Sequence, residues 1–279
     1  MTDAGPLATR SIPATGEVMP MVGLGTWQAF HVSRGTEWDE ARQGLQAFAD
    51  GGGRLVDSSP MYGPAEGVVG DIAAELRLRP RLFLATKVWT TGREAGVAQM
   101  EASFRKLRTE VIDLMQVHNL VDLETHLATL ADWKSRGRVR YVGATHYTES
   151  AYPGLEAAMR RHRLDFVQVN ASVAEREAER RILPLAQERG MAVIVNRPFA
   201  GGDVFARVRR LPLPGWAAEI GCTSWAQVLL KYVLAHPAVT CAIPGTRNPR
   251  HIADNLGAAR GPLPDAAQRA RILEAVQAA

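Results

Sequence analysis

The sequence predicts an α/β protein with the (β/α)8 or TIM-barrel fold, and three observations lead to this prediction. The chain has 279 residues, close to the roughly 250 that are typical of one such barrel. Short apolar runs alternate with longer amphipathic stretches, which is the pattern of parallel strands joined by helices. Hydrophobic residues make up 46% of the chain and charged residues 22%, as in a chain that buries a large core. Since no linker divides the sequence, residues 1–279 are expected to form a single domain.

Eight strand and helix pairs can be placed in order along the chain. Each predicted strand is short and apolar, as a strand buried on both faces should be. The strands are expected at Met21–Leu24, Leu55–Asp57, Leu82–Thr86, Ile112–Val117, Tyr141–Gly143, Phe166–Val169, Ala192–Val195 and Cys241–Ile243. The helices, where apolar residues recur at helical spacing, are expected at Trp38–Asp50, Ala65–Leu78, Val97–Leu107, Glu124–Arg136, Ala151–Arg161, Arg180–Glu188, Ser224–Leu234 and Pro249–Arg260. Gly51, Gly137 and Gly190 lie just past three of these helices, where glycine can adopt the left-handed conformation that ends a helix.

Three further segments complete the predicted fold. The stretch Leu7–Met19 contains the turn signal Ala14-Thr15-Gly16, so an N-terminal β-hairpin is expected to close one end of the barrel. The stretch Pro262–Ala279 is expected to form an extra C-terminal helix on the surface. The segment Ala200–Gly215 is rich in Gly, Pro and Arg, and we expect it to be a flexible lid over the barrel mouth.

Charge and cysteine content indicate the class of partner. The net charge is +4 and the sequence pI is near 9.3, but the basic residues are scattered, which suits an anionic cofactor better than nucleic acid. Cys222 and Cys241 have no metal-ligand spacing, so neither a disulfide framework nor a metal site is expected. No apolar run approaches the roughly 20 residues that span a bilayer, and the N-terminus lacks a signal-peptide pattern. We therefore expect a cytoplasmic protein without membrane contact, and a monomer because no apolar stripe indicates an interface.

Polar side chains stand where several predicted strands end. Asp57 ends the second strand, Lys87 follows the third and His118 follows the fourth, while Tyr62 lies one loop beyond Asp57. The carboxyl ends of barrel strands converge on one mouth, where such enzymes place their active sites. These four residues are therefore the predicted catalytic group.

The chemistry expected of this group follows from its ionisable side chains. A free tyrosine titrates near pH 10, and the ammonium group of Lys87 would lower the pKa of Tyr62 and make it a proton donor. Asp57 would keep the buried lysine charged. His118 would form a hydrogen bond with a substrate carbonyl and orient it.

Each of these residues also has an interpretation without catalysis. A single Asp–Lys pair in a barrel is usually a structural salt bridge, a single histidine at a strand end is usually a satisfied polar group, and Tyr62 alone could pack beneath its loop. The occurrence of all four residues at matching strand ends favours catalytic roles over structural ones. A metal-dependent hydrolase on the same barrel is an alternative, but it would need further ligands beside Asp57 and His118, and Lys87 would repel a cation.

At these residues the sequence resembles the aldo-keto reductase superfamily, whose members carry Asp, Tyr, Lys and His on successive strands in this order. The resemblance covers nearly the whole chain. Its strongest pieces are Gly23-Leu24-Gly25-Thr26-Trp27, the stretch from Asp57 to Gly63 with Glu66 and Gly70, Thr86-Lys87, Asp113-Leu114-Met115-Gln116-Val117-His118 and Ile243-Pro244-Gly245-Thr246. It implies NADPH-dependent reduction of aldehydes or ketones to alcohols, with the hydride from the nicotinamide and the proton from Tyr62. A cofactor-binding regulatory protein with a reductase fold and little turnover is the alternative.

The resemblance also implies a cofactor site across the barrel mouth. The implied contacts are Gly25, Thr26, Trp27, Asp57, Thr145, His146, Gln168, Asn196, Arg197, Pro198, Phe199, Gly245, Thr246, Arg247, His251, Asp254 and Asn255. His146 departs from the commoner Asn, and Asn196-Arg197-Pro198-Phe199 stands where many relatives have a tyrosine that stacks on the nicotinamide. Arg197 or Phe199 could replace that platform, or Phe199 could pack beneath the loop while Arg197 contacts phosphate.

The adenosine end of the predicted site carries two further departures. Gly245 stands where a lysine is common in the family, and His251 where an arginine is common. Arg247 precedes a predicted helix start and is the candidate ligand for the 2′-phosphate, so NADPH is the expected cofactor and NADH the alternative.

The substrate is expected to meet an apolar wall at the mouth. Trp27, Met61, Trp89 and His118 are the predicted substrate-pocket residues, although Trp27 and Trp89 are also large enough to be plain core residues. A small-molecule carbonyl compound is the expected partner.

Overall fold

Eight parallel strands form the centre of the molecule. The computed structural model describes residues 5–279, so the first four residues of the predicted domain lie outside the described part. In sheet order the strands are β3 (Leu24–Gly25), β4 (Leu55–Asp57), β5 (Phe83–Val88), β6 (Ile112–His118), β7 (Val139–His146), β8 (Phe166–Asn170), β9 (Ala192–Asn196) and β10 (Val239–Ala242). Each strand pairs with the next in parallel. Two parallel bridges, Val22 to Ala242 and Gly25 to Gly245, join the first strand region to the last and close the barrel.

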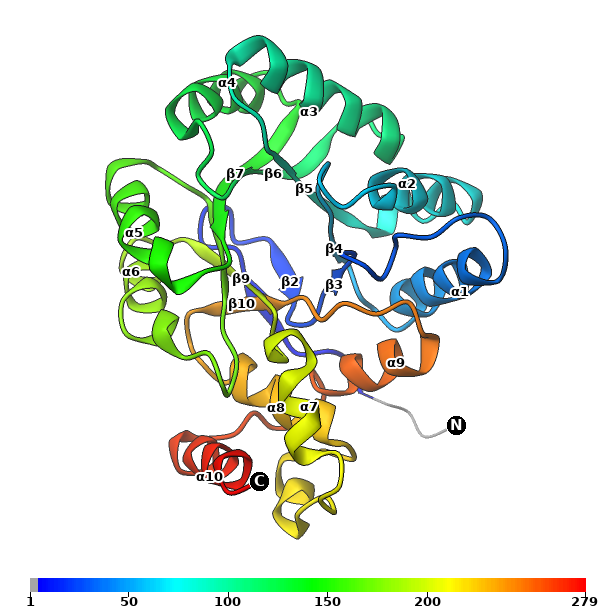
Figure 1. Ribbon diagram of the computed structural model, residues 1–279, viewed down its shortest axis with the longest axis vertical. Helices are drawn as coiled ribbons and strands as arrows, with labels where there is room; N and C mark the ends of the chain where they lie inside the picture. The colour runs from blue at the N-terminus through cyan, green and yellow to red at the C-terminus, as the bar shows by residue number, and fades with distance from the viewer. Residues whose placement is uncertain (1–4) are drawn as a thin grey trace.

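Helices surround these strands, and Figure 1 shows the ring that they form. The helices of the ring are α1 (Thr36–Asp50), α2 (Ala65–Glu75), α3 (Arg93–Leu107), α4 (Leu123–Ser135), α5 (Tyr152–Arg161), α6 (Ile182–Glu188), α8 (Trp225–Leu234) and α9 (Pro249–Gly257). Each helix buries its apolar stripe against the strands. The predicted (β/α)8 barrel is therefore confirmed. Within residues 5–279, no helix has the length and apolar character needed to cross a membrane.

The N-terminal hairpin and the C-terminal helix also form as expected. The antiparallel strands β1 (Thr9–Ser11) and β2 (Val18–Pro20) lie across one end of the barrel, in blue in Figure 1. Ile12 and Met19 are fully buried in one cluster with inward side chains of the barrel strands, such as Phe83 and Phe166. The hairpin therefore closes one end of the barrel, and the other end is free for a site. The final helix, α10 (Ala266–Gln277), begins with a capping box at Asp265.

Several details differ from the sequence-based expectations. The first barrel strand is Leu24–Gly25 and not Met21–Leu24, and helices such as α2 and α6 are shorter than expected. The strand β7 continues to His146, so Thr145 and His146 lie in the strand and not after it. Gly51 keeps a right-handed conformation at the end of α1, because its N–H still bonds to the carbonyl of Ala47, and Gly52 adopts the positive φ instead. The predicted lid segment contains a helix, α7 (Asp203–Val208), where an irregular loop was expected.

Gly70 is expected to be indispensable for the packing of α2 on α3. A Cβ atom at Gly70 would lie 2.0 Å from the backbone carbonyl oxygen of Lys106, so Gly70→Ala should force the two helices apart and lower the free energy of unfolding by about 1–3 kcal/mol. Gly67 lies in the same helix, and a Cβ atom there would meet no described atom within 4 Å, so Gly67→Ala should raise the free energy of unfolding by about 0.5–1 kcal/mol. Urea unfolding midpoints measure both effects, and equal effects of the two substitutions would contradict this account of the packing.

Candidate active site

A buried ion pair lies at the base of the barrel mouth. Lys87 Nζ donates hydrogen bonds of 2.6 Å to Asp57 Oδ2 and 2.6 Å to the carbonyl oxygen of Ser58. The side chains of Lys87 and Asp57 are 1% and 3% exposed. Burial alone would lower the pKa of Lys87, but the attraction of Asp57 and of Tyr62 outweighs it, and the pKa is raised. Lys87 therefore stays positively charged at neutral pH, as the sequence predicted.

Tyr62 lies above this pair, on the loop between β4 and α2. The Lys87 ammonium nitrogen is 4.9 Å from the centroid of the Tyr62 ring. Burial raises the pKa of Tyr62, the charge of Lys87 lowers it and the charge of Asp57 raises it again. The net direction is upward, so the expectation of a pKa below the ordinary value is wrong. The reason is that the loss of solvent outweighs the single ammonium group. Tyr62 consequently holds its proton at neutral pH.

His118 ends β6 and faces Tyr62 across the mouth. The two rings meet edge to face with their centroids 6.0 Å apart. Burial, helped by the positive charge of Lys87 and by His146, lowers the pKa of His118 to about 3. The imidazole is therefore neutral at physiological pH, a state in which it forms hydrogen bonds but carries no charge.

Gln116 connects this group to the neighbouring strands, and the sequence analysis did not single it out. Its Nε2 donates to Asp57 Oδ1 at 3.4 Å and to Gln168 Oε1 at 3.2 Å. The strand register explains the contact, because Gln116 pairs with Lys87 on β5. Gln116 precedes His118 by two residues and therefore points to the same side of its strand. The two-residue spacing between Gln116 and His118 is the sequence feature that could have identified Gln116 as a site residue.

A cavity of about 440 Å³ opens above these residues at the barrel mouth. All four predicted catalytic residues line it. Of the predicted cofactor residues, it is lined by Gly25, Thr26, Trp27, Asp57, Thr145, Asn196, Arg197, Pro198, Phe199 and Gly245. Lining residues outside the predicted catalytic, cofactor and substrate sets are Gln28, Asn119, Tyr147, Gly201, Gly202, Phe205, Ile243 and Pro244. Three of these residues, Gln28, Asn119 and Tyr147, directly follow a predicted site residue, and Ile243 and Pro244 lie just before Gly245. The other three lie in the predicted lid segment, so the strand ends and the lid were the available signals.

Two amide oxygens on the cavity wall suit a polar ligand. Asn119 Oδ1 and Asn196 Oδ1 are buried and have no hydrogen-bond partner among the described residues. A buried acceptor without a partner is costly, and an amide group of a ligand could satisfy it. The nicotinamide carboxamide has such a group. The cavity therefore fits the nicotinamide end of a dinucleotide.

Arg197 and Phe199, the two candidate replacements for the aromatic platform, both line this cavity. Arg197 adopts a positive φ of 49° and its guanidinium group lies 3.5 Å from a carboxylate oxygen of Glu175. The ring of Phe199 packs against Phe205, with centroids 4.8 Å apart. Tyr147 adds an exposed aromatic ring to the same wall. The roles of Arg197 and Phe199 in binding the nicotinamide stay predictions.

The remaining predicted cofactor residues lie away from the cavity lining. Gln168 accepts a hydrogen bond from Gln116, and His146 Nδ1 accepts from the backbone N–H of Tyr147 at 3.1 Å. Around the start of α9, Arg247 forms ion pairs of 2.7 Å with Glu37 and 2.7 Å with Glu40 of α1. The other predicted residues here are Thr246, His251, Asp254 and Asn255, and Asp254 accepts from Ser224 and Gln227 of the α8 region. The roles of these residues in cofactor binding remain predictions.

The predicted substrate wall is assembled in part. Trp27 and Met61 line the cavity and are 53% and 39% exposed, so neither is a core residue. Trp89 is also exposed and its ring centroid lies 6.5 Å from that of His118, but it is not part of the cavity lining. The mouth thus presents exposed apolar side chains beside the polar catalytic group.

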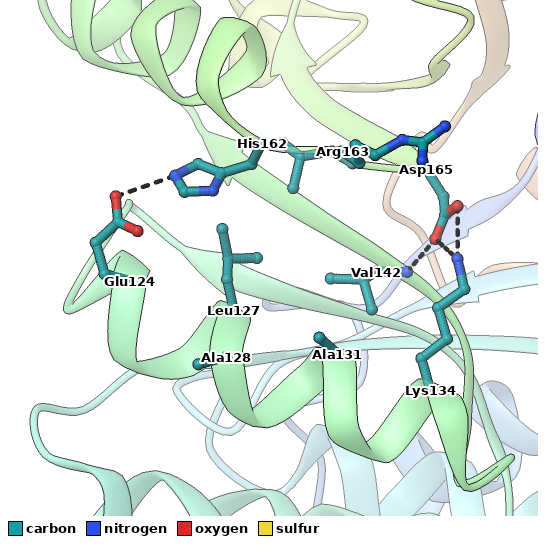
Figure 2. A pocket seen from close by; sticks show the side chains of 10 residues that line it. Glu124, Leu127, Ala128, Ala131, Lys134, Val142, His162, Arg163 and Asp165 are labelled. Carbon is teal, nitrogen blue, oxygen red and sulfur yellow. Dashed lines mark hydrogen bonds and ion pairs between the residues drawn. The ribbon is translucent and has the colours of Figure 1, made fainter.

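A second cavity, of about 400 Å³, lies outside the barrel between α4 and the segment that leads into β8 (Figure 2). Apolar side chains such as Leu127 form its middle, with a hydrogen-bonded pair at one end and an ion pair at the other. His162 contacts Glu124 at 3.0 Å, and Lys134 contacts Asp165 at 2.6 Å. These polar groups are paired with one another, and the cavity contains none of the predicted catalytic residues. Across residues 5–279, no group of three or more His, Cys, Asp or Glu side chains is arranged to hold a metal ion.

Comparison with known proteins agrees with this geometry. The model of the aldo/keto reductase family matches residues 21–275. The chain belongs to this family. Methylglyoxal reductase YeaE of Escherichia coli (strain K12) is 30% identical over 256 residues, which is 88% of each chain. An aldo-keto reductase of Klebsiella pneumoniae, solved in complex with NADPH, superimposes with a TM-score of 0.77 at 25% identity and covers 96% of this chain and 94% of its own.

A further solved structure supports the fold. Aldo-keto reductase AKR11C1 of Bacillus halodurans, in its holo form, has a TM-score of 0.79 at 22% identity and covers 98% of both chains. As a member of the family, the protein is an NAD(P)H-dependent oxidoreductase that acts on small carbonyl compounds. Family membership does not favour the alternative of a regulatory protein with little turnover.

The neutral state of buried His118 should make the stability of the protein depend on pH. Its pKa of about 3 lies below the ordinary 6.5, so the unfolded chain binds this proton more readily than the folded chain does. The free energy of unfolding should therefore fall as the pH drops from about 6.5 towards 3, by up to about 1.4 kcal/mol per pH unit from this residue. Urea unfolding of the wild type and of His118→Gln across this window measures the contribution. The stability difference between the two proteins should change steadily with pH, and a constant difference would contradict the prediction.

Proposed function

We propose that the protein reduces an aldehyde or ketone to the alcohol with NADPH and that Tyr62 donates the proton. One observation carries the proposal: Tyr62 and His118 face each other in a cavity, beside a buried Lys87–Asp57 pair. This arrangement supplies a proton donor, a group to stabilise the anion that remains and a donor to orient the carbonyl.

NADPH bound in the cavity would supply the hydride to the carbonyl carbon. As negative charge develops on the substrate oxygen, the Tyr62 hydroxyl gives it a proton and becomes a phenolate. The ammonium group of Lys87 stabilises this phenolate, since it already lowers the pKa of Tyr62 against the effect of burial. Asp57 keeps Lys87 charged in its buried position. His118 holds the carbonyl oxygen by a hydrogen bond.

The residues around α9 would bind the adenosine end of the cofactor. Arg247 lies just before the α9 N-terminus, where backbone N–H groups and the helix dipole favour a phosphate. Its pairing with Glu37 and Glu40 pre-orients the guanidinium group, and it also places two negative charges beside the 2′-phosphate position. The preference for NADPH over NADH should therefore rest on Arg247 but should be moderate in size.

The substrate would be a small carbonyl compound. A relative that is 30% identical is named a methylglyoxal reductase, so methylglyoxal is the first substrate to assay. The exposed rings of Trp27 and Tyr147 on the cavity wall favour testing an aromatic aldehyde beside it.

We propose further that the chain acts as one domain and as a cytoplasmic monomer. The two cysteines, Cys222 and Cys241, are free and buried, which suits a reducing compartment. Among the described residues, the large apolar side chains that are exposed are Val18, Trp27, Met61, Trp89, Tyr147 and Leu211, and three of them, Trp27, Met61 and Tyr147, line the cavity. Light scattering of the purified protein tests the monomer.

Replacement of Tyr62 by Phe should remove the proton donor and leave the cofactor site intact. We expect kcat for an aldehyde to fall about 10²- to 10⁴-fold, because general acid catalysis typically contributes that much. The dissociation constant of NADPH, measured by quenching of tryptophan fluorescence, should not change. Full activity of Tyr62→Phe would rule out this residue as the proton donor.

Removal of Arg247 should change the choice between the two cofactors. Arg247→Ala should weaken NADPH binding by about tenfold or more, because one charge-assisted hydrogen bond to phosphate is lost, and should leave NADH binding nearly unchanged. Glu37→Gln should strengthen NADPH binding selectively, because it removes a negative charge beside the phosphate position. Arg189→Ala is the control, since Arg189 is an exposed residue at the end of α6, near the barrel end that the hairpin closes. Equal losses for NADPH and NADH would contradict the assignment of Arg247.

A further inference from the structure

Ser59 lies beneath the loop that carries Tyr62, in contact with His118. It is fully buried. Its Oγ lies 3.1 Å from His118 Nδ1, and the backbone N–H of Met61 donates to the same oxygen at 3.3 Å. A serine hydroxyl thus touches one ring nitrogen of the predicted catalytic histidine.

The protons of this small network can be assigned by counting donors and acceptors. A serine hydroxyl has one proton to donate, and a neutral imidazole has one N–H and one bare nitrogen. The Met61 N–H already donates to Ser59 Oγ, so the hydroxyl proton needs an acceptor elsewhere. Among the described residues, His118 Nδ1 is the acceptor within hydrogen-bond distance. The other assignment, with the proton on Nδ1, would leave the buried hydroxyl without an acceptor, which is unfavourable.

The protonation state of the His118 ring supports this assignment of the protons. The pKa of His118 is lowered to about 3, chiefly by burial, so the ring carries only one proton at neutral pH. His118 lines the cavity, and its Nε2 forms no hydrogen bond within the described part of the chain. If Nδ1 accepts from Ser59, the single ring proton must lie on Nε2.

We propose that Ser59 is a positioning residue that fixes the tautomer of His118. Its hydroxyl donates to Nδ1 and thereby keeps the proton on Nε2, where His118 can donate it in a hydrogen bond to the substrate carbonyl oxygen. The opposite tautomer would turn a lone pair towards that oxygen and repel it. The catalytic part of this inference rests on the proposed function, whereas the tautomer itself does not.

The tautomer can be read in the free protein by nuclear magnetic resonance. The protein is labelled with ¹⁵N-histidine, and its seven histidines are observed through two-bond couplings between ring protons and nitrogens at neutral pH. The His118→Gln variant identifies the His118 signals. His146 and His236 are internal references, because each accepts a backbone N–H on Nδ1 and must carry its proton on Nε2.

In the wild type, His118 should show the same pattern of ring couplings as His146 and His236. In Ser59→Ala, the Nδ1 signal should move to that of a nitrogen without a hydrogen-bond donor, and a fraction of the ring should carry its proton on Nδ1. Ser59→Thr keeps the hydroxyl and should retain the wild-type pattern. A wild-type His118 protonated on Nδ1, or unchanged His118 signals in Ser59→Ala, would overturn the proposal. Unchanged signals of the other histidines show that the variants are folded.

Kinetics then test the consequence for catalysis. In Ser59→Ala, kcat/KM for an aldehyde should fall by a few-fold to about tenfold, and Ser59→Thr should restore it, while NADPH affinity stays the same in both. A loss in Ser59→Ala that Ser59→Thr does not restore, with the Nε2 tautomer intact in both variants, would show that Ser59 acts through the Tyr62 loop and not through His118. Absence of turnover in the wild type would contradict the proposed function and leave the tautomer measurement valid.

Discussion

The contact between Lys87 and Asp57 is the interaction on which the site depends. Burying two charges costs free energy, and their mutual attraction compensates only when the contact is close and other hydrogen bonds complete it. Here the 2.6 Å contact is completed by the carbonyl of Ser58 and by Gln116. The closed barrel makes this possible, because β4 and β5 are adjacent and hold the two residues at fixed register.

One ammonium group influences two neighbours that both stay uncharged at neutral pH. The charge of Lys87 lowers the pKa of both Tyr62 and His118. For Tyr62 it opposes burial, so the phenol keeps its proton but loses it more easily than burial alone would allow. For His118 it adds to burial, so the imidazole is neutral. The charge of Lys87 thus makes Tyr62 a stronger acid than burial alone would allow and helps to keep the neighbouring His118 neutral.

The hairpin contacts that stabilise the barrel and the residues of the candidate active site lie at opposite ends of the barrel. The hairpin fills one end with Ile12 and Met19, and the hydroxyl of Tyr141 donates to Glu17 of the hairpin at 2.8 Å. The mouth carries the exposed rings of Trp27 and Tyr147. This separation leaves the mouth free to carry buried polar atoms, such as Asn196 Oδ1, that have no partner among the described residues and that a ligand can satisfy.

The sequence by itself determined the barrel, the order of its strands and the meeting of the four predicted catalytic residues in one cavity, because the buried strands are continuous apolar runs and strand ends in a barrel must converge. It could not supply the net pKa of Tyr62, since a pKa depends on how much solvent the folded loop excludes. It also did not reveal the contact between Ser59 and His118, which are 59 positions apart. Local pattern identifies which residues reach the mouth, whereas side-chain contacts between different strands and loops are decided only when the barrel closes.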